Sequence, residues 1–149
     1  MALLDLINTD VVKVPLEART KNAVIRELVE TLRDAGKIAD VEPVYDAVIA
    51  RENMGSTGLE NGIAVPHAKT RAVRKLTMAL GISPQGVEFQ AMDGKPSKLF
   101  FLLLAPPDQS GPHIQALAEI ARITKSQSFC NSIVEAPSAE AVVALFSED

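Results

Sequence analysis

The feature that most constrains the fold is an apolar run of seven residues, Leu99–Ala105. A strand with one face in water alternates apolar and polar residues, whereas a run without polar residues is typical of a strand buried on both faces. The run is far too short to cross a bilayer, which needs about 20 residues. A strand buried on both faces needs a layer on each side, so we expect a sheet covered by helices on both faces.

Periodicity and capping residues predict the other elements. The expected strands are Val11–Leu16, Ile63–Val65 (ended by Pro66), Leu76–Ile82 and Lys98–Leu104. The expected helices are one from N-cap Thr20 to Gly36, one from near Asp40 with Pro43 in its first turn, one after a loop at Asp108–Pro112, and two from about Ser126 and Ser138. Because helices and strands interleave, we expect an α/β fold: one domain, residues 1–149, with a mixed β-sheet flanked by helices on both faces.

The residue spacing predicts the apolar faces of two of the expected helices. In the helix from Asp40, the predicted buried face is Val44, Ala47 and Val48, and Arg51 shares that side. In the helix after Pro112, the predicted apolar face is Ile114, Leu117, Ala118 and Ala121.

Charge and composition narrow the partners and the compartment. The net charge of −4 argues against nucleic acid as a partner, because phosphate backbones need a basic surface. The single cysteine, Cys130, forms no internal disulfide and fits a reducing compartment. The start, Met1–Asp10, has no basic region before its apolar stretch and does not resemble a signal peptide. We therefore expect a cytoplasmic protein with no direct membrane insertion.

The chain has two histidines, His67 and His113, and both lie where chemistry is often found. His67 follows an expected strand and Pro66, at the start of a loop. His113 lies at the expected N-terminus of a helix, where free N–H groups favour anions and disfavour an imidazolium. Ordinary roles are open as well: a loop histidine is often a surface residue, Arg51 can complement a helix dipole, and Ser56 and Thr57 can stabilise a turn.

The residues around His67 resemble a known family. Arg51-Glu52, Gly55-Ser56-Thr57-Gly58 and Asn61–His67 are similar to the active-site stretch of the mannitol/fructose class of enzyme IIA of the bacterial sugar phosphotransferase system. Glu52, Leu59 and Ile63–Ala68 fit the family pattern, whereas Glu60 stands where the family has Gly or Ala. The resemblance continues in Asp93–Pro96, Leu104–Pro106, His113, the Phe129 region and Pro137–Glu140.

The resemblance implies a phosphocarrier. In the family, phospho-HPr donates its phosphoryl group to the histidine that matches His67, which passes it to an enzyme IIB. Arg51 would then be a charged clamp, since a guanidinium offers paired donors to phosphate oxygens. His113 would be the second active-site histidine, and Ser56 or Thr57 would donate a hydroxyl hydrogen bond. No metal or cofactor is expected, because donors around the oxygens suffice.

The residues are also compatible with other functions. Within the family, the alternative to sugar uptake is a nitrogen-regulatory protein whose phosphorylation state controls other proteins. A non-catalytic module would use His67 and His113 to hold a ligand or metal, although two histidines alone make a poor zinc site. A hydrolase would need Ser56 and His113 as nucleophile and base, without a nucleophile-elbow pattern.

Overall fold

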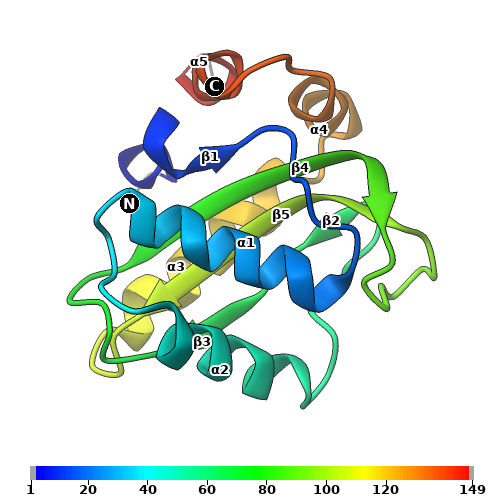
Figure 1. The fold of residues 1–149 in the computed structure, drawn as a ribbon. Coiled ribbons are helices and arrows are strands. Elements are labelled where there is room, and N and C mark those ends of the chain that lie inside the picture. The colour runs from blue at the N-terminus through cyan, green and yellow to red at the C-terminus, as the bar shows by residue number, and fades with distance from the viewer. Residues whose placement is uncertain (1–2, 148–149) are drawn as a thin grey trace.

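The computed structural model describes residues 3–147, and these form an open five-stranded mixed sheet between two layers of helices (Figure 1). The strands are β1 (Val12–Lys13), β2 (Ile63–Ala64), β3 (His67–Lys69), β4 (Thr77–Val87) and β5 (Ser97–Ala105). The helices are α1 (Lys21–Asp34), α2 (Val41–Glu52), α3 (Ser110–Ile123), α4 (Gln127–Val134) and α5 (Ala139–Ser147), with 3-10 turns η1 (Leu3–Leu6) and η2 (Thr9–Val11). The expected α/β fold with a mixed sheet is confirmed, although the predicted limits, Met1 and Asp149, lie outside the described residues.

The two long strands form the centre of the sheet. β4 and β5 pair antiparallel, and β1 pairs parallel with the outer edge of β4. β2 and β3 lie one after the other along the other edge of β5, both parallel to it, with Ile63 opposite Leu99 and His67 opposite Leu103. This edge of the sheet therefore carries His67.

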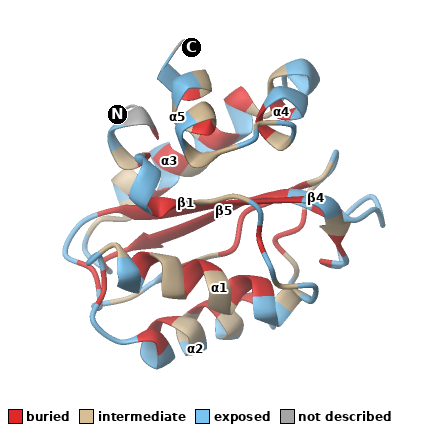
Figure 2. Cartoon of the chain, turned by 45° about the horizontal axis from the view of Figure 1, so that its top comes forward, coloured by how far each residue is buried: buried red, intermediate tan, exposed pale blue. Residues whose placement is uncertain are grey.

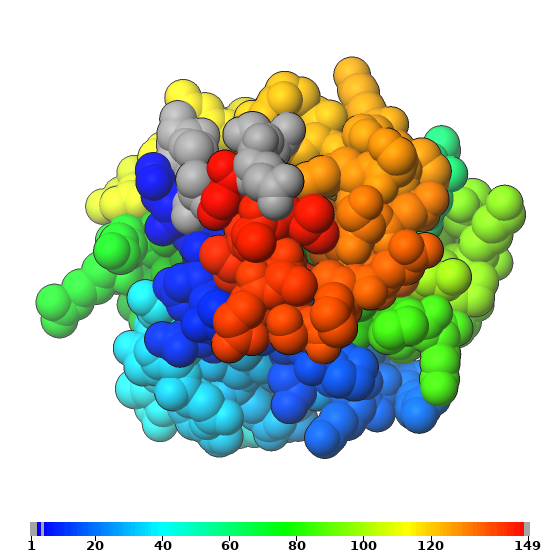
Figure 3. Space-filling model, turned by 90° about the horizontal axis from the view of Figure 1, so that it is seen from above, coloured from blue at the N-terminus to red at the C-terminus, as the bar shows by residue number. Residues whose placement is uncertain are grey.

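The apolar run is buried on both faces, as predicted. Phe100, Leu102 and Leu104 belong to the core beneath α1 and α2, whereas Leu99, Phe101 and Leu103 belong to the core beneath α3, α4 and α5. Figure 2 shows the sheet as a buried band between these two layers. In Figure 3, α5 lies beside the N-terminal segment, and it contacts both β1 and η2.

Local capping signals predicted the helix starts well. The side chains of Thr20 and Ser126 accept bonds from the backbone N–H groups of Ala23 (3.3 Å) and Phe129 (3.2 Å). The Ser138 hydroxyl caps α5 by accepting from the N–H of Ala141 at 3.1 Å. These bonds form within one turn, so the sequence alone can predict them.

The predictions for α3 are wrong in two respects. The expected loop at 108–112 is already helical from Ser110. Pro112 is tolerated there because it lies in the first turn, where backbone N–H groups make no hydrogen bond within the helix. The buried face is His113, Ala116, Ile120 and Ile123. The predicted face is turned outward instead: the Ile114 residue is 66% exposed, Ala118 and Ala121 are exposed, and Leu117 is half-buried.

Two strand predictions also need correction. The expected strand 11–16 is reduced to β1, and a cis Val14–Pro15 bond follows it. The expected strand 63–65 ends at Ala64, and His67 lies in the short strand β3 rather than in a loop. Pro66 has no N–H to donate, but the chain rejoins β5 immediately after it.

Candidate functional site

The position of His67 is set by its place in β3, at the edge of the sheet and next to α2. The ring is half-buried, and its Nδ1 lies 2.8 Å from the carbonyl oxygen of Val65. Since a carbonyl can only accept, Nδ1 carries the proton and donates it to Val65. In the neutral ring, the lone pair of His67 is therefore on Nε2.

His113 brings a second imidazole against the first. The two ring centroids are 5.4 Å apart, and the rings meet edge to face at 74°. His113 is 5% exposed, and its Nε2 has no hydrogen-bond partner among the described residues. Burial lowers the pKa of His113, and it is lowered further by repulsion from His67 when that ring is protonated and by the charge of Lys69. His113 is thus a neutral, buried ring with an unused nitrogen beside His67.

Lys69 is a site residue that the sequence analysis missed. It lies two positions after His67 in β3, so the two side chains point to the same side of the strand. Its ammonium donates to the hydroxyl of Ser110, the first residue of α3, at 2.7 Å. This bond joins β3 to the N-terminus of α3 and places a positive charge beside the histidine pair. The period-two spacing from His67 was the signal that could have identified it.

Arg51 lies in the last turn of α2. Its Nη1 donates to the carbonyl oxygen of Gly55 at 2.8 Å, so the side chain fastens the loop that follows α2. A guanidinium has five N–H groups, and this bond uses one of them. Arg51 is half-buried, and the helix that carries it packs against β3.

Ser56 and Thr57 lie in that loop, and their hydroxyl hydrogens are already donated. The Ser56 hydroxyl donates to the carbonyl oxygen of Phe89 at 2.7 Å and accepts from the N–H of Gly58 at 3.0 Å. The Thr57 hydroxyl donates to Glu52 at 2.5 Å. Because the Ser56 proton is committed to Phe89, the described contacts do not make Ser56 and His113 a nucleophile–base pair.

A buried carboxylate organises the same loop. Glu52 is 5% exposed, and it accepts from both the N–H (2.8 Å) and the hydroxyl of Thr57. The ammonium of Lys21, at the start of α1, lies 3.0 Å from the Glu52 carboxylate. The network joins the end of α2, the 53–58 loop and the start of α1. The family pattern has an acidic or amide residue at position 52, which was the available signal for this role.

Two other properties bear on the candidate functions. Within the part of the chain that the structure describes, no three His, Cys, Asp or Glu side chains lie close enough together to hold a metal ion. None of the described helices is both long enough and apolar enough to span a membrane.

Comparison with known proteins decides the family. The model of the family described as "Phosphoenolpyruvate-dependent sugar phosphotransferase system, EIIA 2" matches residues 5–149. The chain belongs to this EIIA 2 family. Its class of activity is therefore phosphoryl transfer within this phosphotransferase system.

Relatives of this chain are named as fructose-specific phosphotransferase components and as nitrogen regulatory proteins. The chain is 37% identical over 129 residues to the fructose-specific EIIA component of Haloferax volcanii, with 87% of this chain and 84% of that protein covered. It is 32% identical over 148 residues to the fructose-specific EIIABC component of Bacillus subtilis, but spans only 23% of that protein's length. The crystal structure of the nitrogen regulatory protein IIA-Ntr from Neisseria meningitidis is similar, with a TM-score of 0.88, 30% identity and 97% and 98% of the two chains covered.

The fold also matches a IIA protein seen with its partner. That structure is the Escherichia coli complex of mannitol IIA with phosphorylated mannitol IIB, with a TM-score of 0.81, 23% identity and 96% and 98% coverage. At 23% sequence identity, this similarity shows a shared fold alone.

Proposed function

We propose that this chain is a cytoplasmic phosphocarrier, with residues 1–149 acting as one domain, that accepts a phosphoryl group on Nε2 of His67 from phospho-HPr and passes it to an enzyme IIB. The observation that carries the proposal is the bond from His67 Nδ1 to Val65, which leaves the Nε2 lone pair available. A neutral imidazole in this tautomer is a good nucleophile near pH 7.

The reaction needs little besides placement and charge. The bond between phosphorus and the donor nitrogen breaks as the bond to His67 Nε2 forms, and the His67 proton stays on Nδ1, donated to Val65. Charge develops on the equatorial oxygens in such a transition state, so positive groups and N–H donors around them speed the transfer. Lys69 supplies a charge on this side, and the unpartnered nitrogen of His113 supplies a hydrogen-bond site for a phosphoryl oxygen.

Arg51, Ser56 and Thr57 have supporting roles in this proposal. Arg51 uses its remaining N–H groups as a clamp on the phosphoryl oxygens while one stays on Gly55. Ser56 and Thr57 hold the loop in shape through their bonds to Phe89 and Glu52, so their contribution to phosphoryl binding is through loop position rather than through free hydroxyl hydrogens.

A docking surface for the donor and acceptor proteins lies next to the histidine pair. The outward face of α3 presents Ile114, which is 66% exposed, one residue after His113. Ala118 and Ala121 continue this apolar face along the helix. Exposed apolar side chains beside a reactive group are typical of a site that another protein covers.

The test is incubation with phosphoenolpyruvate, enzyme I and HPr, followed by intact mass. We expect the wild type to gain one acid-labile phosphate and His67→Ala to gain none. His113→Ala should still take up the phosphate but pass it to an enzyme IIB slowly, because it lacks only a group beside the acceptor. Uptake of an acid-labile phosphate by folded His67→Ala would refute the assignment.

A nitrogen-regulatory role is the second candidate. It is favoured by the similarity to IIA-Ntr, which extends over nearly the full length of both chains. Incubation of the phosphorylated protein with a fructose-type enzyme IIB separates the two. Rapid transfer supports sugar uptake, whereas a stable phosphoprotein that does not transfer favours the regulatory role.

A further inference from the structure

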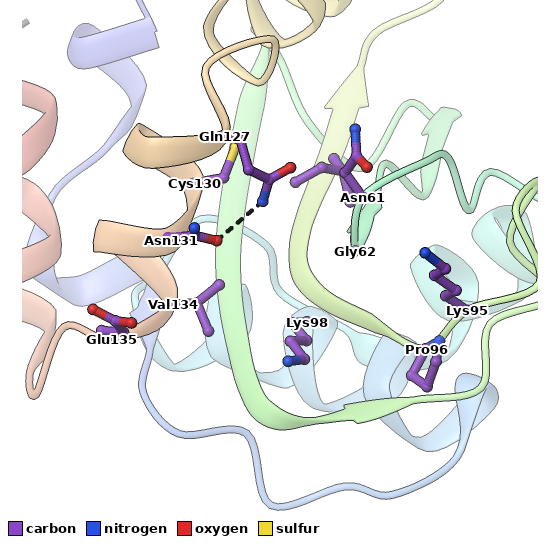
Figure 4. Close-up of a pocket in the computed structure, with 11 residues that line it drawn as sticks. Asn61, Gly62, Lys95, Pro96, Lys98, Gln127, Cys130, Asn131, Val134 and Glu135 are labelled. Atoms are coloured by element: carbon purple, nitrogen blue, oxygen red, sulfur yellow. Dashed lines mark hydrogen bonds between the residues drawn. The ribbon is translucent and has the colours of Figure 1, made fainter.

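A pocket of about 400 Å³ lies at the opposite end of β5 from the candidate site (Figure 4). One wall is the segment around Lys95 and Lys98, another is Asn61–Gly62 before β2, and the third is one face of α4. In the pairing with β5, Ile63 at the pocket and His67 are four residues apart, which corresponds to about 13 Å along a strand. The pocket is therefore separate from the histidine pair.

The walls are held in place by backbone hydrogen bonds. The carboxylate of Asp93 accepts from the N–H of Asn61 and from the N–H of Lys95, both at 3.0 Å, and these bonds lower the pKa of that carboxyl. The carbonyl oxygen of Gly62 accepts from the N–H groups of Lys98 (2.8 Å) and Leu99 (2.9 Å). Two segments far apart in the sequence are thus joined, so the pocket is formed before anything binds.

The charged lining has a net positive charge, with Lys95 and Lys98 against one carboxylate. Neither Lys95 nor Lys98 forms an ion pair with any of residues 3–147. Lys95 is near enough to Asp93 for its charge to lower the pKa of that carboxyl. The negative charge of Asp93 therefore offsets the charge of Lys95 more than that of Lys98. Glu135 also lines the pocket, but Figure 4 shows it at the far edge, with Val134 between it and Lys98 in this view.

The α4 wall adds neutral polar groups over an apolar floor. Gln127 and Asn131, one turn apart, are bonded to each other from Gln127 Nε2 to Asn131 Oδ1 at 3.0 Å. The amide oxygen of Gln127 and the amide N–H₂ of Asn131 remain for a ligand. The buried Cys130 and the half-buried Val134 supply apolar surface beside them.

From this lining we propose that the pocket binds a small hydroxylated anion, with its phosphate or carboxylate group at Lys98 and Lys95 and its hydroxyl groups at Gln127 and Asn131. The ammonium groups provide strong charge-assisted donors for an anion. Paired amides offer both a donor and an acceptor, which suits hydroxyl groups. A pocket of this volume has room for a body of about six carbons.

The test uses three probes with the same six-carbon body: sorbitol, gluconate and sorbitol 6-phosphate. Each is titrated into ¹⁵N-labelled protein, and the amide shifts of Gly62, Lys98 and Asn131 are followed. We expect saturable shifts with at least one of the two anions and none with sorbitol. The anion that binds more tightly identifies whether phosphate or carboxylate is the natural group.

Charge-matched variants locate the binding. Lys95→Gln/Lys98→Gln should weaken the anion's affinity at least about fivefold, since two partly exposed charge contacts each contribute a factor of a few. Lys37→Gln/Lys75→Gln removes two exposed charges that do not line this pocket, and it should bind as the wild type does. Equal affinity of both variants, shifts centred on Ser110 and His113, or no saturation by either anion would overturn the proposal.

Discussion

The carboxylate of Glu52 offers the sharpest test of the loop network. Glu52→Gln keeps the shape of the side chain but removes its negative charge. That charge makes three contacts, one with the ammonium of Lys21 at 3.0 Å and two with the backbone N–H and the hydroxyl of Thr57. Hydrogen bonds to a charged group are stronger than neutral ones by roughly 1 kcal/mol each, so three such contacts give an expected loss of about 3 kcal/mol in the free energy of unfolding. The side chain of Glu52 is 2% exposed, so water cannot replace these contacts.

The assay is urea unfolding followed by circular dichroism. Glu60→Gln is the matched control, because Glu60 is an exposed carboxylate eight positions further along the same chain segment, and it should change stability by less than about 0.5 kcal/mol. A double-mutant cycle with Lys21→Gln should give a coupling of about 1 kcal/mol, as expected for groups in contact. A loss below 1 kcal/mol for Glu52→Gln, or no coupling with Lys21, would refute the reasoning.

Three further predictions concern the histidine pair, the core and the docking face. The lowered pKa of His113 means that its unfolded form takes up a proton below about pH 6.5 before the folded form does, so stability falls as pH falls through that range, with a slope of at most about 1.4 kcal/mol per pH unit. Urea unfolding at several pH values should show a shallower fall for His113→Gln, and parallel curves would contradict the assignment. Gly81→Ala would place a Cβ 2.7 Å from Leu28 Cδ2 in the core and should cost about 1–3 kcal/mol by urea unfolding, whereas Gly111→Ala, with nothing within 4 Å, should cost nothing. If Gly81→Ala left the free energy of unfolding unchanged, the neighbouring side chains of Leu28 and Leu16 would have to move aside at no cost. Ile114→Ser should raise the KM for phospho-HPr about fivefold with kcat unchanged, because one exposed apolar contact of about 1 kcal/mol is lost on docking. An effect on kcat alone, in the steady-state transfer assay, would instead place Ile114 in the chemical step.

Much of the fold could be predicted because its signals are local or one-dimensional. Thr20, Ser126 and Ser138 cap helices through bonds that span three residues, so no tertiary information is needed to place them. The Leu99–Ala105 run predicted the central strand because burial on both faces removes the polar alternation. Short edge strands such as β1 and β3 were missed or misplaced because their pairing depends on β4 and β5, which are distant in sequence.

The α3 helix shows where sequence periodicity is insufficient. Two stripes fit a helical spacing, one through Ile114 and Leu117 and one through His113, Ala116 and Ile120. The first stripe, with Ala118 and Ala121, is wholly apolar and was the natural choice for the core, yet the stripe that contains His113 is the buried one. The rotation of α3 is decided by its packing on β5 and by the bond from Lys69 to Ser110, neither of which can be read from the spacing.

By itself, the sequence determined the capped starts of α1, α4 and α5, the doubly buried strand and the family, and through the family it indicated His67, His113 and Arg51. These follow from short-range hydrogen bonds, from apolar patterning and from a contiguous motif. Only the tertiary structure decided that the two histidine rings meet at 5.4 Å, that Lys69 lies beside them and that Ile114 faces outward. The physical reason is that each depends on how β3 and α3, more than 40 residues apart in the chain, dock on the same strand.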